Sequence, residues 1–297
     1  MRLIALALSA AIAAAPAWSE TTRIETATGT AEVPANPAST VVFDMAALDT
    51  LDALEVPGLA SIGNTYLDYL SDYEGEAGTL FEPDFEALNA MQPDLVILGG
   101  RSAEQVEPVS RLAPAIDMTI WGEDILGQAR DRITSYGALY DRADAAEALL
   151  AQIDDAIANV QAAAEGQGDA LIVLTNGPKV SAYGAGSRFG WLHAASGLPE
   201  AAEGLDASTH GEAVSFEFIR EVNPDWLIVI DRGAAIGAES QSARSTLDNP
   251  LVRETAAWQN DRIVYLDAAR VYIAGGGAQA TLDTLGILED ALAGGKS

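Results

Sequence analysis

FEALNAMQPDLVILGGR (residues 85–101) aligns without a gap to FEFIREVNPDWLIVIDR (residues 216–232), at a constant offset of 131. Both copies share the opening Phe-Glu, the Pro-Asp pair, the apolar run after it and the closing arginine. Each copy predicts a helix, a break at Pro-Asp, a buried strand and an arginine at the carboxyl end of that strand. A gapless match of this length predicts two structurally equivalent lobes.

Short apolar segments on both sides of the repeat predict the remaining strands. Residues 21–33 alternate β-forming and turn residues around Gly29, which predicts a hairpin. Further apolar runs alternate with helical or turn-rich segments, a pattern typical of α/β lobes with mostly parallel sheets. The predicted strands are 40–43, 59–63, 95–98 and 118–121 in the first lobe, and 170–174, 226–230 and 263–266 in the second.

A long helix is predicted between the lobes. Residues 125–165 contain no proline, and apolar side chains from Ala146 to Val160 recur at helical spacing. The uninterrupted part, 143–165, would span about 35 Å, roughly the diameter of a lobe. We therefore predict an α/β fold with an N-terminal lobe, a rigid linking helix, a C-terminal lobe and a ligand cleft between the lobes. The predicted boundaries are 20–140, 141–166 and 167–297.

The first 19 residues, MRLIALALSAAIAAAPAWS, predict a cleaved secretory signal peptide. Arg2 precedes an apolar run, 3–15, that is shorter than the ~20 residues needed to cross a bilayer. Ala17-Trp18-Ser19 offers a small-x-small cleavage site, and no cysteine follows that could carry a lipid. We therefore expect a soluble protein of the bacterial periplasm without a lipid anchor.

The composition excludes several classes of function. The 297 residues include 16 Lys and Arg against 44 Asp and Glu, a formal net charge of −28. This charge argues against binding to nucleic acid or to anionic lipid surfaces. The absence of cysteine excludes disulfides, thiolate metal sites and cysteine nucleophiles. With only two histidines, a three-histidine metal site is also excluded.

Three arginines are predicted to converge between the lobes. Arg101 and Arg232 end the two repeat copies, and ligands of open α/β sheets bind beyond the carboxyl ends of the strands. Arg188 lies in the glycine-rich stretch YGAGSRFGW, residues 183–191, at a predicted helix start. Three guanidinium groups in one cleft suit an anionic ligand that is rich in oxygen atoms.

His210 and Tyr272 are two further candidates. Both are expected in loops at the same edge of the second lobe as Arg232. A lone loop histidine is usually a surface residue and a lone tyrosine usually packs, so neither is informative alone. Together, an imidazole and a phenolate form a suitable ligand pair for Fe(III), a hard Lewis acid.

With these features the chain resembles the periplasmic iron–siderophore binding proteins of ABC importers, whose two Rossmann-like lobes are joined by a rigid helix. The resemblance covers essentially the whole mature chain, including Val33-Pro34-Ala35-Asn36-Pro37 after the hairpin. It is closest to the subgroup for ferric catecholates, in which three cleft arginines surround the anionic complex. In some members a histidine and a tyrosine coordinate iron. The positions that match are Arg101, Arg188 and Arg232 for the complex, and His210 and Tyr272 for iron.

The resemblance also implies partners and a mechanism. The protein would have no intrinsic cofactor and no catalytic residues, and as a monomer it would deliver its ligand to a permease dimer in the inner membrane. A tetradentate bis-catecholate leaves part of the octahedral Fe(III) shell open for His210 and Tyr272, whereas a hexadentate tris-catecholate would use the arginines alone. One glutamate per lobe contacts the permease in this family, and Glu86 and Glu217 hold equivalent positions in the repeat.

Three alternatives stay open at this point. A protein of the same fold could carry a hydroxamate siderophore, cobalamin or haem. A dinucleotide-binding enzyme is disfavoured because Gly184-x-Gly186-x-x-x-Gly190 has a final spacing one residue too long. A hydrolase is disfavoured because the chain has no Gly-x-Ser-x-Gly motif, and neither histidine has a recognisable acid and nucleophile partner.

Overall fold

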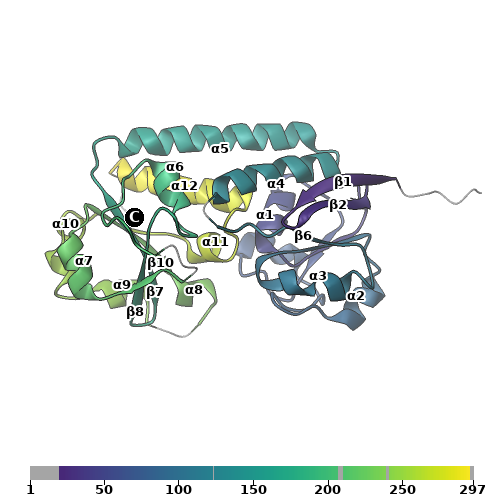
Figure 1. Cartoon of the computed structure of the whole chain (residues 1–297), viewed down its shortest axis with the longest axis horizontal. Coiled ribbons are helices and arrows are strands. Elements are labelled where there is room, and N and C mark those ends of the chain that lie inside the picture. Colours follow the sequence, from purple (N-terminus) through teal and green to yellow (C-terminus); the bar gives the residue numbers. More distant parts are fainter. Residues whose placement is uncertain (1–19, 123, 207–209, 239–240, 295–297) are drawn as a thin grey trace, which may run out of the picture.

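The computed structural model describes residues 20–122, 124–206, 210–238 and 241–294. The predicted signal peptide, 1–19, lies outside this part. Two α/β lobes lie at opposite ends of the molecule, and the long helix α5 (Ala143–Ala164) runs alongside both (Figure 1). The prediction of a two-lobed α/β fold with a long helix between the repeats is confirmed. In the described part of the chain, no helix combines the length and hydropathy needed to cross a membrane.

The N-terminal lobe contains a parallel sheet with the strand order β4-β3-β5-β6. The antiparallel hairpin of β1 and β2 precedes it, as predicted. The strands are β1 (Thr21–Thr26), β2 (Gly29–Pro34), β3 (Thr40–Val42), β4 (Leu59–Ser61), β5 (Leu95–Leu98) and β6 (Ala115–Asp117). The helices are α1 (Met45–Ala53), α2 (Phe85–Met91), α3 (Val106–Val109) and α4 (Ile125–Leu139), with 3-10 helices at Asp68–Tyr73 and Gly100–Gln105.

The C-terminal lobe contains a mixed sheet with the order β11-β10-β7-β8-β9, in which β11, β10 and β7 are parallel. The two outer strands β8 and β9 are antiparallel and were not predicted. The strands are β7 (Ala170–Asn176), β8 (Lys179–Tyr183), β9 (Glu212–Val214), β10 (Trp226–Asp231) and β11 (Ile263–Tyr265). The helices are α6 (Trp191–Ser196), α7 (Phe216–Val222), α8 (Arg232–Ala235), α9 (Ala243–Leu247), α10 (Ala256–Gln259), α11 (Ala268–Tyr272) and α12 (Ala278–Leu292), with a 3-10 helix at Val252–Glu254.

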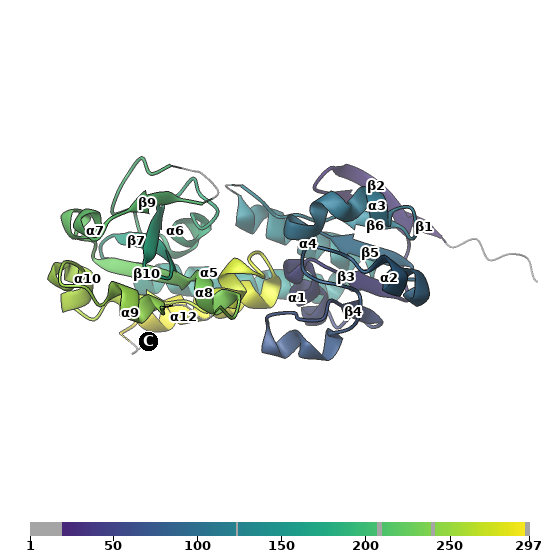
Figure 2. The same cartoon turned by 90° about the horizontal axis from the view of Figure 1, so that it is seen from below.

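The two copies of the sequence repeat also have the same local structure. Its two copies form α2 with β5 and α7 with β10. Both helices end on a left-handed residue at the same repeat position, Gln92 with φ 48° and Asn223 with φ 49°. The two sheets lie on opposite sides of the centre of the molecule (Figure 2). The arginine after each repeat strand can therefore reach the space between the lobes.

The Pro-Asp pairs fix how each repeat strand meets its parallel neighbour. Asp94 Oδ2 accepts hydrogen bonds from the backbone N–H groups of Ala38 and Ser39, both at 3.0 Å, just before β3. Asp225 exchanges bonds in the same way with Asp169, just before β7. Gly168 has φ +94°, and a Cβ there would lie 1.9 Å from Asp225 Oδ2, so the close approach requires glycine. These carboxylates tie the starts of adjacent strands together.

The predicted strand 118–121 is wrong. Strand β6 lies earlier, at Ala115–Asp117, because its pairing with β5 ends at Leu98 opposite Asp117. The Met118 N–H makes the last backbone hydrogen bond to β5, to the Leu98 carbonyl oxygen at 2.7 Å, and the chain then leaves the sheet toward the space between the lobes. This displacement brings Trp121 to that space, where it is 48% exposed.

Candidate functional site

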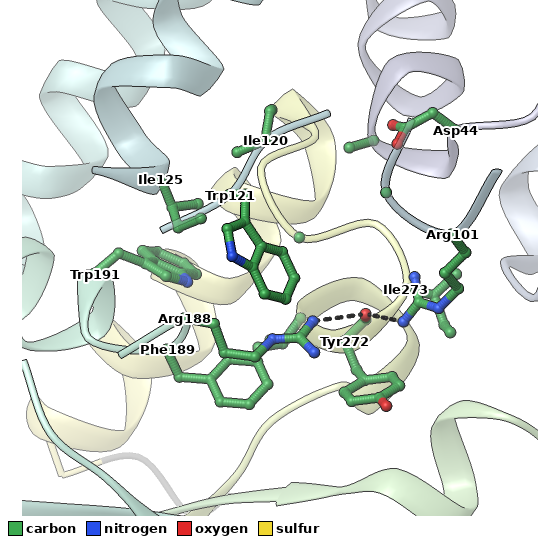
Figure 3. A pocket seen from close by; sticks show the side chains of 14 residues that line it. Asp44, Arg101, Ile120, Trp121, Ile125, Arg188, Phe189, Trp191, Tyr272 and Ile273 are labelled. Carbon is green, nitrogen blue, oxygen red and sulfur yellow. Dashed lines mark hydrogen bonds between the residues drawn. The ribbon is translucent and has the colours of Figure 1, made fainter. Parts of the chain in front are cut away.

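A cavity of about 300 Å³ opens between the lobes, and both lobes contribute to its walls (Figure 3). The N-terminal lobe supplies Asp44, Arg101 and Trp121. The C-terminal lobe supplies Arg188, Trp191 and Tyr272, with Phe189 beside them. The cavity is therefore a site at the carboxyl ends of strands in two facing sheets, the usual location of ligands in open α/β folds.

Local structure explains how each predicted arginine reaches this region. Arg101 follows β5 in the 3-10 helix Gly100–Gln105, after Gly100 has turned the chain with φ +51°. Arg232 is the first residue of α8, directly after β10. Arg188 lies in the turn between β8 and α6, three residues before that helix begins. All three side chains are half-buried.

Tyr272, the last residue of α11, brings the three guanidinium groups together. Arg101 and Arg188 both donate from Nη2 to the Tyr272 carbonyl oxygen, at 3.0 and 3.4 Å, as Figure 3 shows. Arg232 donates from Nε to the phenol oxygen at 3.1 Å. The Cζ atoms of the three lie 5.1, 4.7 and 5.9 Å from the centre of the tyrosine ring, within the range of cation–π contact. Four of the five predicted ligand-binding residues thus meet at Tyr272, and of these Arg101, Arg188 and Tyr272 line the cavity, whereas Arg232 reaches the tyrosine phenol and is not among the lining residues.

The charges at this point perturb two pKa values. Burial raises the pKa of Tyr272, but the hydrogen bond from Arg232 and the positive charges of Arg232, Arg188 and Arg101 outweigh it, so that the pKa lies below its usual value. Burial and the nearby charge of Arg101 lower the pKa of Arg188, while the side chains of Tyr272 and Tyr183 oppose this effect. The site therefore favours negative charge on the phenol and offers guanidinium donors to an anion.

His210 is not brought to this point. It is exposed, lies in the turn before β9 and is not among the residues that line the cavity. Its neighbour Gly211 packs so closely on Tyr183 that a Cβ there would lie 2.8 Å from the ring. Tyr183 in turn meets Phe189 edge to face, with 4.7 Å between ring centres. The His210 loop is thus one layer of side chains away from the cavity wall.

Aromatic walls are the part of the site that the sequence analysis missed. The guanidinium carbon of Arg188 lies 4.7 Å from the centre of the Phe189 ring and 5.8 Å from that of Trp121. Trp191 closes the same side of the cavity (Figure 3). Phe189 and Trp191 stand in the glycine-rich stretch around Arg188, and this proximity was the available signal. Trp121 gave no such signal, because the sequence analysis placed it inside the predicted strand 118–121.

Glu86 and Glu217 lie outside the cavity. Each is the second residue of its repeat helix, α2 or α7, and each is exposed. The structure thus places them at equivalent positions on the two lobes. In the described residues no group of three or more His, Asp or Glu side chains is arranged to hold a metal ion.

Comparison with known proteins identifies the family to which this chain belongs. A family model described as periplasmic binding protein matches residues 41–269, and this chain belongs to that family. The petrobactin-binding protein YclQ of Bacillus subtilis (strain 168) is 36% identical over 268 residues, which cover 88% of this chain and 84% of YclQ. The ferric-anguibactin-binding protein FatB of Vibrio anguillarum is 31% identical over 277 residues, covering 90% of this chain and 85% of FatB.

Solved structures give the same result. The crystal structure of YclQ matches with a TM-score of 0.84 and 33% identity, covering 92% of this chain and 99% of that one. The periplasmic catecholate-siderophore binding protein VctP of Vibrio cholerae matches with a TM-score of 0.83 and 30% identity, covering 91% of this chain and 99% of that one. The proteins to which this chain is similar are thus siderophore-binding proteins by name.

The lowered pKa of Tyr272 leads to a spectroscopic prediction. Replacing Arg232 by Gln removes a hydrogen bond and a charge that favour the phenolate, so the Tyr272 pKa should rise. Arg101→Gln should raise it less, because its charge is the weakest of the contributions. Ultraviolet titration of tyrosinate, taken as the difference between each protein and the same protein with Tyr272→Phe, isolates this phenol. A Tyr272 phenol that titrates at or above its ordinary value in the unaltered protein would contradict the site electrostatics.

Proposed function

We propose that this chain captures a ferric siderophore of the catecholate type and delivers it to an ABC permease in the inner membrane. The observation that carries the proposal is the convergence of Arg101, Arg188 and Arg232 on Tyr272 beside an aromatic-walled cavity. The names of YclQ and VctP, a petrobactin-binding and a catecholate-siderophore binding protein, support the same ligand class.

The chemistry of the cavity suits this ligand. Catecholate oxygens bound to Fe(III) carry negative charge, and guanidinium groups donate charge-assisted hydrogen bonds to such oxygens. The catechol rings are flat and apolar, so Trp121, Phe189 and Trp191 offer surfaces on which they can stack. A ferric tris-hydroxamate is neutral and would leave the three cationic groups without an anionic partner. The site therefore favours a catecholate over the hydroxamate alternative.

Tyr272 and His210 are the proposed iron ligands for a tetradentate complex. The pKa of Tyr272 already lies below its usual value, which favours the phenolate that Fe(III) prefers. Its phenol oxygen accepts from Arg232 Nε at 3.1 Å, and a phenolate oxygen keeps further lone pairs for iron. His210 would approach from its exposed loop, one side-chain layer from the cavity. Iron in this proposal is cargo held by the siderophore, and the protein needs no resident cofactor.

The proposal includes a cellular setting. Residues 1–19 would direct export and be removed, leaving a periplasmic monomer without a lipid anchor that binds its ligand and catalyses no reaction. The lobes would comprise 20–140 and 167–297, with 141–166 as the link. Glu86 and Glu217 would each meet one half of a permease dimer, because a pseudo-symmetric protein can present equivalent charges to equivalent surfaces.

The arginines provide the first test. Arg101→Ala, Arg188→Ala and Arg232→Ala should each weaken binding of a ferric bis-catecholate about ten- to a hundredfold, since a charge-assisted hydrogen bond contributes ~1.5–3 kcal/mol. Quenching of the fluorescence of Trp121 and Trp191, which line the cavity, reports the affinity. Arg111→Ala is the matched control, because Arg111 is exposed and pairs with Glu107 outside the cavity. Unchanged affinity in all three of these arginine variants would refute the proposal.

The two proposed iron ligands are tested by the denticity of the chelator. His210→Ala and Tyr272→Phe should weaken binding of a tetradentate ferric bis-catecholate far more than that of a hexadentate tris-catecholate, because only the former leaves iron sites open. The charge-transfer band of the bound tetradentate complex should shift in the Tyr272→Phe variant. Equal losses for both chelators would mean that the two side chains pack against the ligand without coordinating iron.

Permease docking is tested by charge reversal. Glu86→Arg combined with Glu217→Arg should abolish iron uptake by cells while leaving the affinity for the siderophore unchanged, since both side chains are exposed and outside the cavity. Exposed pairs contribute only ~0.2–1 kcal/mol each, but reversal adds repulsion at both sites. The control reverses Glu147 and Asp155, which are exposed on α5 (Figure 1). Normal uptake by the Glu86 and Glu217 variant would exclude this docking mode.

A further inference from the structure

One acidic side chain faces a cavity that is otherwise built for anions. Asp44 follows β3 and stands at the N-terminus of α1, where it lines the cavity together with Arg101 and Arg188. Figure 3 shows its carboxylate on the α1 side, while the guanidinium groups of both arginines turn toward the Tyr272 carbonyl oxygen. The cavity thus has a cationic side and an anionic side.

The Asp44 carboxylate is only partly used by the protein. Its Oδ1 accepts the backbone N–H of Ala47 at 2.9 Å, which caps α1. No side chain among the described residues donates a hydrogen bond to either oxygen, and no ion pair joins Asp44 to a described arginine. Oδ2 lies over the backbone of Gly99, where a Cβ would come within 2.5 Å of it. Glycine at 99 therefore leaves room for Oδ2 beside the cavity.

Helix capping accounts for one oxygen of the Asp44 carboxylate but not for its place in the cavity wall. Aspartates also cap α2 (Asp84), α4 (Asp124), α8 (Asp231) and α11 (Asp267), but of all these capping aspartates only Asp44 lines the cavity between the lobes. Burial and the charge of Asp117 raise the pKa of Asp44, while the backbone N–H groups of Ala47 and Ala46 and the charge of Arg101 oppose this effect. A carboxylate with one free oxygen beside an anion site repels the oxygens of the anion, so it needs a donor from the ligand to offset that cost.

We propose that Asp44 binds a positively charged N–H group, an ammonium, in the linker that joins the chelating rings of the siderophore. The ligand is then a catecholate chelator with an amine-containing linker: its iron-bound oxygens face Arg101 and Arg188, and its ammonium donates to Asp44 Oδ2. This inference rests on the proposed function and narrows its ligand class. It makes Asp44 a residue that selects among catecholates by the charge of their linkers.

The experiment uses two ferric bis-catecholates with linkers of equal length, one with a secondary amine at its centre and one with an ether oxygen there. The unaltered protein should bind the amine-linked complex about tenfold more tightly, as expected for one charge-assisted hydrogen bond in a partly solvated cavity. Asp44→Asn and Asp44→Ser should abolish this preference, and both retain an oxygen that can cap α1. Asp84→Asn is the control, because Asp84 caps α2 in the same way and is exposed outside the cavity.

The outcomes separate this inference from the proposed function. Preference for the amine-linked complex in the unaltered and Asp84→Asn proteins, lost in both Asp44 variants, supports the ammonium subsite. Equal affinity of the unaltered protein for the two complexes, or a preference that persists in Asp44→Asn, overturns the subsite and leaves the catecholate function standing. Failure of the unaltered protein to bind either complex overturns both. Melting temperatures of the Asp44 variants within a few degrees of the unaltered protein confirm that the fold is intact.

Discussion

Three like charges converge on Tyr272, and the cleft depends on how this one residue accommodates them. Half-buried guanidinium groups repel each other more strongly than they would in water, because the protein interior screens charge poorly. Tyr272 offers them three kinds of electron-rich group. Its carbonyl oxygen accepts from Arg101 and Arg188, its phenol oxygen accepts from Arg232, and its ring lies within cation–π distance of all three. The arginines are thus held close together, with donor groups left over for an anion. The same three positive charges lower the pKa of the Tyr272 phenol.

The position of Tyr272 is itself fixed from both lobes. Four residues separate Tyr272 from Gly277, which is the N-cap of α12 and has no side chain to cap that helix. The cap comes from the other lobe: Asp49 on α1 accepts the backbone N–H groups of Gln279 and Ala280 at 2.8 and 3.0 Å. Burial raises the pKa of Asp49 to about 7, although these bonds and one from Tyr69 oppose the shift. Helix α12 also packs along α5, so two helices connect the lobes, and the cleft geometry is built into their packing.

The sequence analysis predicted best the elements that occur in both copies of the internal repeat. The repeat revealed β5, β10 and their arginines because a buried parallel strand, its Pro-Asp start and its end residue all leave marks in the local sequence. Strands β8 and β9 left weaker marks, since they are short, partly exposed and next to glycines. Asp44 and Trp121 could not be assigned to the cavity, because their role depends on the other lobe and on where β6 stops pairing. His210 shows the converse: its sequence position suggested the cleft edge, but its side chain is exposed and does not line the cavity.

The acidic surface determines how the cleft can act on an anionic ligand. A protein with a net charge of −28 repels anions at a distance, and the field of three arginines is screened beyond about 8 Å at physiological ionic strength. The arginines therefore contribute little to long-range attraction and act once the ligand is inside the cavity. There the donors are already oriented by Tyr272, so the ligand does not have to order them, and less binding free energy is lost to side-chain entropy. Discrimination between ligands must then come from short-range contacts with fixed groups of both signs, and the cavity wall holds the Asp44 carboxylate as well as Arg101 and Arg188.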